Sequence, residues 1–144
     1  MAEQAKQVVF DILSNTAEIQ RANDKFSYTA KLWKIPQKAV FDIALVMEEI
    51  LSLIVRLGKR INAPRINITL FLHNDLLIII LRYPGIQFNP LDINTTATVI
   101  SRSEDEDVVG GLGMDIIKEL ANSISYERKG EQNKITIQKK IFSL

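Results

Sequence analysis

The chain has 144 residues, of which 47% are hydrophobic and 24% charged, and this length and balance are typical of one globular domain with a sizeable core. The formal net charge of +1 argues against a dedicated nucleic-acid-binding or membrane-surface protein. The absence of cysteine excludes a disulfide framework, a zinc–thiolate site and a thiol nucleophile. The polar N-terminus shows no signal-peptide pattern, and the longest apolar run, Leu76 to Leu81, is too short to span a bilayer. We therefore expect a cytoplasmic protein.

The first part of the chain predicts a strand and then a helix. Residues 6–14, KQVVFDILS, are rich in β-branched and aromatic residues, as strands are. Asn15 offers an N-cap for the segment Thr16–Lys34, in which apolar residues recur near helical spacing. This segment should be the first helix.

The middle of the chain predicts a long helix followed by a β-hairpin. Pro36 suits the first turn of this helix, the apolar stripe from Val40 to Leu57 should lie against a sheet, and Gly58 should end the helix. The segments Arg65–Leu72 and Leu76–Tyr83 should form the two arms of the hairpin. The second arm contains LLIIIL, and such a continuous apolar run predicts a central strand that is buried on both faces.

The last part of the chain predicts a long loop, a short helix and a second hairpin. Residues Gln87–Val109 lack clear periodicity and should form the loop, and Met114–Ala121 should form the helix. The strands Ser123–Arg128 and Lys134–Ile141 should be joined by a turn at Lys129–Gln132.

The order of these elements predicts the fold class. The chain shows no internal repeat and no linker, so we expect a single domain over residues 1–144. Its economical fold is α+β, a two-layer α/β sandwich in which a mixed β-sheet carries the helices on one face.

The densest motif is the run Gly110-Gly111-Leu112-Gly113, which stands directly before the last expected helix. Glycines let backbone N–H groups approach a ligand closely, and the positive end of the following helix points at the same place. The motif therefore favours a phosphate cradle. The alternative is backbone geometry alone, because the entry into a helix also accommodates glycine.

Four segments carry a family resemblance: MEEILSLIVRLG with Glu48-Glu49, GIQFNPLD from Gly85, GGLGMDIIKEL from Gly110, and SYERKGEQNKITIQKKI from Ser125. In this order, over nearly its whole length, the chain resembles the anti-sigma-factor serine-kinase branch of the histidine-kinase-like (GHKL) ATPases. The resemblance implies an α/β sandwich that binds ATP between helices and a lid, with the lid in the loop before Gly110. It also implies a partner, a sigma factor or an antagonist protein phosphorylated on serine, and a homodimer.

The resemblance assigns roles to several residues. Glu49 matches the glutamate that acts as general base or orients water, and the alternative is an ordinary helix-surface glutamate. Arg56 matches the basic position beside the phosphates, with a solvated charge as the equal alternative. Four glycines match the family's glycine pattern: Gly85, Gly110, Gly111 and Gly113.

Other nucleotide-facing positions depart from the family. Leu53 stands where the family has the asparagine that coordinates magnesium, and leucine supplies no oxygen ligand. Tyr83 replaces the aspartate that reads the adenine amino group, and losing such a hydrogen bond costs about 1.5–3 kcal/mol. Asn133 and Thr136 match the polar positions of the family's last strands, and the threonine there supports this aspartate, so Thr136 loses its partner here. ATP is thus the implied cofactor, but magnesium is not expected to be held in the usual way, and we expect no metal-ligand set of another kind.

The scaffold motifs survive while the ligand positions change, and this favours a regulatory domain that acts by binding a sigma factor or an antagonist-type protein. Three alternatives stay open, and with them the question whether the protein is an enzyme. One is an active ATP-dependent serine/threonine kinase that phosphorylates an antagonist. Another is metal-free binding of a different nucleotide or small molecule against Leu53, Leu57 and Tyr83. The last is an α+β domain of unrelated function.

Overall fold

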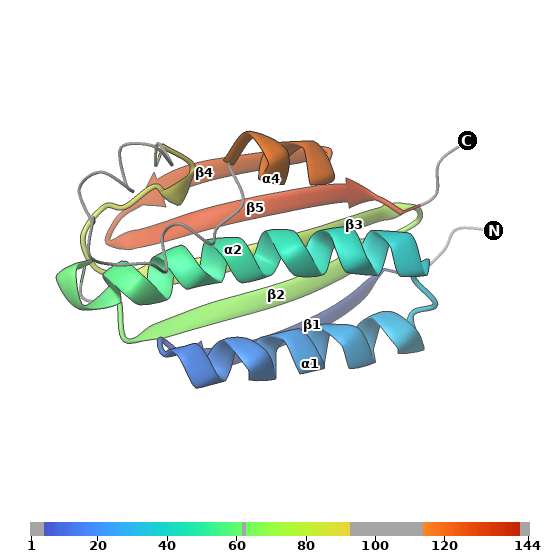
Figure 1. Ribbon diagram of the computed structural model, residues 1–144, viewed down its shortest axis with the longest axis horizontal. Helices are drawn as coiled ribbons and strands as arrows, with labels where there is room; N and C mark the ends of the chain where they lie inside the picture. Colours follow the sequence, from blue (N-terminus) through green and yellow to red (C-terminus); the bar gives the residue numbers. More distant parts are fainter. Residues whose placement is uncertain (1–4, 62, 93–113, 142–144) are drawn as a thin grey trace.

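The computed structural model describes residues 5–61, 63–92 and 114–141 of the chain. Figure 1 shows the elements, which follow one another as β1 (Lys6–Leu13), α1 (Thr16–Leu32), α2 (Gln37–Ile61), β2 (Arg65–His73), β3 (Leu76–Pro84), the 3-10 helix η1 (Pro90–Asp92), α4 (Met114–Leu120), β4 (Ser123–Lys129) and β5 (Gln132–Lys140). Each expected strand and helix is present, and apart from the C-terminal end of α2 the ends are shifted by no more than two residues. Most of the long loop expected over residues 87–109 lies outside the described residues.

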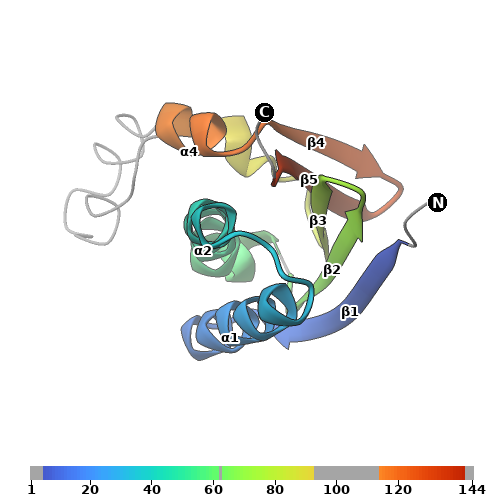
Figure 2. The ribbon, with the colours of Figure 1, turned by 90° about the vertical axis from the view of Figure 1, so that its right-hand side faces the viewer.

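The sheet has five strands in the order β1-β2-β3-β5-β4. All four pairs between neighbouring strands are antiparallel, and the two hairpins β2–β3 and β4–β5 supply two of these pairs. Figure 2 shows α1, α2 and α4 on one face of the sheet. The expected two-layer α+β sandwich is therefore confirmed, but its sheet is antiparallel in the described residues where a mixed one was expected. Tight turns join only antiparallel strands, which explains the difference for both hairpins.

Helix α1 has well-defined caps at both ends. The Asn15 side chain accepts a hydrogen bond from the Glu18 backbone N–H (2.9 Å), which confirms the expected N-cap. At the other end Lys34 adopts a positive φ of 58°, and the Ile35 N–H donates to the Ala30 carbonyl (3.0 Å). This is a Schellman-type ending, and it stops the helix at Leu32 rather than at Lys34.

Helix α2 begins directly after Pro36 and continues to Ile61. The expected end at Gly58 is therefore wrong. An interior glycine costs a helix only about 1 kcal/mol relative to alanine. The long apolar face of α2, with Ile43, Met47 and Ile50 fully buried against the core, can offset that cost.

Strand β3 is central in the sheet, but it is not buried on both faces. Leu77, Ile79, Leu81 and Tyr83 point to the helices and are fully buried, whereas the alternating residues, including Ile78 and Ile80, are only half-buried. Because the described helices all lie on one face (Figure 2), the other face has no covering layer in the part of the chain that the structure describes. The continuous apolar run LLIIIL did not distinguish these two environments.

A buried ion pair connects three elements at one end of the sandwich. Lys139 on β5 donates to the Asp42 carboxylate on α2 (3.3 Å) and to the Leu120 carbonyl at the end of α4 (2.7 Å). Lys38 also pairs with Asp42, one helical turn away (3.0 Å). The Asp42 side chain is only 5% exposed, so these contacts position α4 against α2 and the sheet.

Candidate nucleotide-site region

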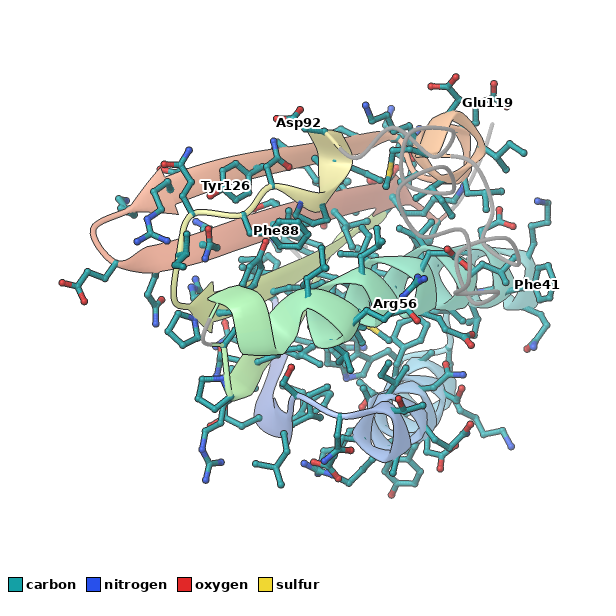
Figure 3. The ribbon with its side chains drawn as sticks, turned by 60° about the vertical axis from the view of Figure 1, so that its left-hand side comes forward. Phe41, Arg56, Phe88, Asp92, Glu119 and Tyr126 are labelled. Carbon is teal, nitrogen blue, oxygen red and sulfur yellow. The ribbon has the colours of Figure 1, made fainter. Side chains whose placement is uncertain are left out.

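One face of α2 carries three of the residues expected at a nucleotide site. Glu49, Leu53 and Arg56 are four and three residues apart, so they lie on the same side of the helix. All three are half-buried, and Figure 3 shows Arg56 projecting from α2. The face therefore combines a carboxylate, an apolar side chain and a guanidinium.

The guanidinium of Arg56 is not fully satisfied. Its Nη1 atom is buried, and no hydrogen-bond partner reaches it in the described structure. Leaving a buried polar group unpaired costs about 1–3 kcal/mol, and more for a charged group. A cationic donor in this state suits an anion such as a carboxylate or a phosphate.

Tyr83 occupies the inner face of β3, under the helices. Its side chain is fully buried, and its hydroxyl donates a hydrogen bond to the Phe88 carbonyl (2.7 Å). Burial, and to a smaller extent the nearby Tyr126, raises the pKa of the Tyr83 hydroxyl far above its usual value. The hydroxyl is thus a neutral donor that already has an acceptor.

Asn133, the direct partner of Tyr83 on β5, is fully buried and uses both ends of its amide. Its oxygen accepts from the Phe88 N–H (2.9 Å) and from the Tyr126 hydroxyl (2.5 Å). Its nitrogen donates to the carbonyls of Tyr83 and Ile86, both at 3.2 Å. Together with the Tyr83–Phe88 bond, these contacts form a closed polar network, which we call the Tyr83–Asn133 network (Figure 3 labels Phe88 and Tyr126).

Gly85 lies in the turn that this network holds. Its φ of 102° is a conformation that residues with a side chain rarely adopt, and its carbonyl accepts from Arg128 Nη1 (2.7 Å). The turn geometry alone therefore requires glycine here. Gly85 and Arg128 also line an open cavity of about 790 Å³ at this end of the sheet.

The remaining expected site residues are not all brought together. Thr136 alternates with the buried Ile135 and Ile137 on β5, so it lies on the outer face of the sheet, opposite to the side chain of Tyr83. It cannot support the Tyr83 position, and Asn133 does so instead. The glycines of the GGLG motif (Gly110, Gly111 and Gly113) lie outside the described residues, and the expected short helix α4 follows them.

Sequence reasoning missed the network although it singled out Tyr83. Asn133 precedes Ile135 and Ile137 in the same alternation, and this placed a polar amide at an inward position of a strand. The resemblance had marked Asn133 as a polar family position, and this alternation was the signal that its side chain points inward. The partner residues Phe88 and Tyr126 had no signal of their own, because the network joins segments that lie far apart in the sequence.

Two further properties concern metal ions and membranes. Within residues 5–61, 63–92 and 114–141, histidine, aspartate and glutamate side chains form no group of three or more that could hold a metal ion. Among the helices of these residues, none combines the length and the apolar character needed to cross a membrane.

The comparisons with known proteins agree with this architecture. Residues 12–139 match the family profile described as "Histidine kinase-like ATPase domain". The chain belongs to the histidine kinase-like ATPase family. No curated protein matches the chain with significance.

Among solved structures, this histidine kinase-like domain is similar to a chain in the crystal structure of the SiaB–SiaC complex from Pseudomonas aeruginosa. The similarity has a TM-score of 0.55 and covers 92% of this chain and 88% of that chain, at 9% sequence identity. At this identity the likeness concerns the fold. The superfamily part of the expected resemblance is thus confirmed, and the anti-sigma serine-kinase branch stays a prediction.

Proposed function

We propose that this histidine kinase-like domain is a regulatory module that acts by binding a protein partner, and that its nucleotide site is degenerate. The observation that carries the proposal is the Tyr83–Asn133 network. The family uses a carboxylate at the Tyr83 position to accept a hydrogen bond from adenine. Here the position holds a buried neutral hydroxyl that donates to Phe88, so an acceptor for the base is missing.

Admitting a base beside Tyr83 would also disturb the network. The Asn133 amide makes hydrogen bonds with five different residues, and separating these groups without replacement costs about 1–3 kcal/mol for each group left unpaired. Binding energy from a nucleotide would have to offset this cost. The arrangement therefore disfavours adenine in the family's usual position.

The face of α2 that carries Glu49, Leu53 and Arg56 supports the proposal that the magnesium site is degenerate as well. Magnesium requires oxygen ligands in near-octahedral geometry, and Leu53 offers none. Glu49 is the single carboxylate among the three residues of this face. The donor set therefore fits magnesium poorly and supports no catalytic step through Mg–ATP.

The structural relative supports a protein partner. The similar chain was solved within the SiaB–SiaC complex, so this fold assembles with another protein in that case. For the present chain we infer a partner of the sigma-factor or antagonist class, the class implied by the sequence resemblance. The implied homodimer and cytoplasmic location remain predictions.

Size-exclusion chromatography with the purified sigma factors and antagonist-type proteins of the same organism tests this function. We expect one of these proteins to co-elute with the domain at equal stoichiometry whether or not Mg–ATP is present. A complete failure of both classes to co-elute, or a complex that forms only with Mg–ATP, would contradict the proposal.

The second candidate function is an active ATP-dependent serine kinase. One observation favours it, namely the buried and unpartnered Nη1 atom of Arg56, which suits a phosphate group. Transfer of labelled γ-phosphate to a co-eluting antagonist, abolished in Arg56→Ala, would establish this alternative. Absence of transfer to a partner that binds would remove it.

A further inference from the structure

A cavity lies at the corner where α1 ends and α2 begins, away from the face of α2 discussed above. It has a volume of about 610 Å³, and its lining includes Tyr28, Lys31, Lys34, Gln37 and Val40. The Schellman-type ending of α1 creates this corner, because it reverses the chain between Leu32 and Gln37 within a few residues.

The cavity lining includes one large exposed aromatic side chain, that of Tyr28. Tyr28 is 67% exposed, Leu32 61% and Phe41 62%, and Figure 3 shows Phe41 at the N-terminal end of α2. Leu32 and Phe41 follow the lining residues Lys31 and Val40 on α1 and α2 but are not themselves part of the lining. An exposed aromatic side chain that lines a cavity is a typical anchor of a protein interface.

The charged side chains that line the cavity are all positive. Lys31 and Lys34 both line the cavity, and neither forms an ion pair with another described residue. Asp42, the acidic residue on the first turns of α2, is buried and is already paired with Lys38 and Lys139. The cavity lining thus combines two cationic groups with the exposed aromatic side chain of Tyr28.

We propose that this corner docks an acidic segment of a protein partner, one that carries at least one large apolar side chain for the cavity. Acidic groups on the segment would pair with Lys31 and Lys34, and its apolar side chain would pack against Tyr28. A lipid surface fits less well. Polybasic membrane-binding sites use clusters of about 4–8 lysines or arginines, whereas this corner is concave and has two lysines lining it.

The conformation of Lys34 provides a useful variant. Its positive φ of 58° favours glycine, so Lys34→Gly removes the charge and relaxes the backbone at the same time. This variant should lose binding while it gains stability. Unfolding therefore cannot explain its loss of binding.

Selection from a phage-displayed library of random peptides tests the inference. The library is selected on the immobilised wild-type protein and, in parallel, on Lys31→Glu, on Lys34→Gly and on the control Lys118→Glu. The control places the same charge reversal on the exposed face of α4. We expect peptides enriched on the wild type to be acidic and to contain a large apolar residue. Their affinity should fall about tenfold on the first two variants and stay unchanged on the control, since tenfold corresponds to the loss of about 1.4 kcal/mol.

Enriched peptides without an acidic excess, or peptides that bind Lys31→Glu as tightly as the wild type, would overturn the inference. Vesicles of phosphatidylserine that bind the wild type but not Lys31→Glu, without any peptide enrichment, would assign the corner to a lipid surface instead. The inference rests on the proposed function, because it assumes a protein partner. The two fail separately: a sigma factor or antagonist that binds equally well to Lys31→Glu and Lys34→Gly removes only this docking site.

Discussion

Asn133 and Tyr83 face each other across β5 and β3, and their side chains bind the protein's own turn after β3. The family resemblance leads one to expect a ligand-reading position here. The buried amide and hydroxyl instead satisfy Phe88, Ile86 and Tyr126. These internal hydrogen bonds occupy the position where the family would bind a ligand, so changes at Asn133 and Tyr83 should affect the stability of the fold.

Asn133→Ala should destabilise the fold strongly, because it removes the side-chain acceptor of the Phe88 N–H and the side-chain donor to three carbonyl groups in a buried place. We expect the free energy of unfolding to fall by about 3–5 kcal/mol, measured by urea denaturation. Thr136→Ala, on the outer face of the same strand, is the control and should cost less than about 1 kcal/mol. Equal losses in the two variants would show that the network contributes little.

Tyr83→Phe should change the pH dependence of stability. The pKa of the Tyr83 hydroxyl is raised in the folded protein above the ordinary value of 10.0, so the unfolded chain releases this proton first. The stabilising contribution is complete below pH 10 and is lost as the pH rises above that value. Urea denaturation at neutral and alkaline pH should show a smaller alkaline loss in Tyr83→Phe than in the wild type. Identical alkaline losses would mean that the hydroxyl ionises freely in the folded state.

At the scale of elements, the contacts between α2, α4 and β5 should depend more on Lys139 than on Lys38. Lys139→Met removes the pairing of buried Asp42 with β5 and the donor to the Leu120 carbonyl. It should therefore cost about 3 kcal/mol or more, because a buried carboxylate loses a partner. Lys38 pairs with the same carboxylate, but its side chain is 83% exposed.

The matched variant Lys38→Met should accordingly cost less than about 1 kcal/mol, as exposed ion pairs do. Thermal and urea unfolding of both variants provide the measurement. If Lys38→Met were as destabilising as Lys139→Met, the burial of Lys139 would not be the deciding factor.

The ending of α1 allows a stabilising change. A residue with a side chain in the left-handed conformation costs about 1–2 kcal/mol, and Lys34 adopts it at φ 58°. Lys34→Gly should raise the free energy of unfolding by about 1 kcal/mol, which a higher thermal midpoint would reveal.

Gly130 has a similar φ of 61° with no atom near its missing Cβ, so Gly130→Ala should lower the free energy of unfolding by about the same amount. A stabilising Gly130→Ala would contradict this account of both turns.

At the scale of the whole molecule, the sequence predicted the elements well because their signals are local. The hairpin β2–β3 and the N-cap Asn15 each depend on a few adjacent residues. The one-sided burial of β3 was not predictable from LLIIIL, since it depends on which face of the sheet the helices cover. The continuation of α2 through Gly58 likewise reflects packing along the whole helix.

The site could be predicted only in part for a related reason. Leu53 and Tyr83 were recognisable as unusual residues within their own motifs. The contact that gives Tyr83 its new environment comes from Asn133, which is 50 residues away in the sequence. Only the pairing of β3 with β5 brings the two together, so single-sequence reasoning identified the altered position without its replacement contacts.

Isothermal titration calorimetry with ATP, in the presence and absence of magnesium, tests the central claim most directly. The claim is that the domain keeps the histidine kinase-like scaffold without the family's Mg–ATP site. We expect no binding with a Kd tighter than about 1 mM, and no difference when magnesium is added. Magnesium-dependent binding with a Kd of about 10 μM or tighter, lost in Arg56→Ala, would contradict the claim.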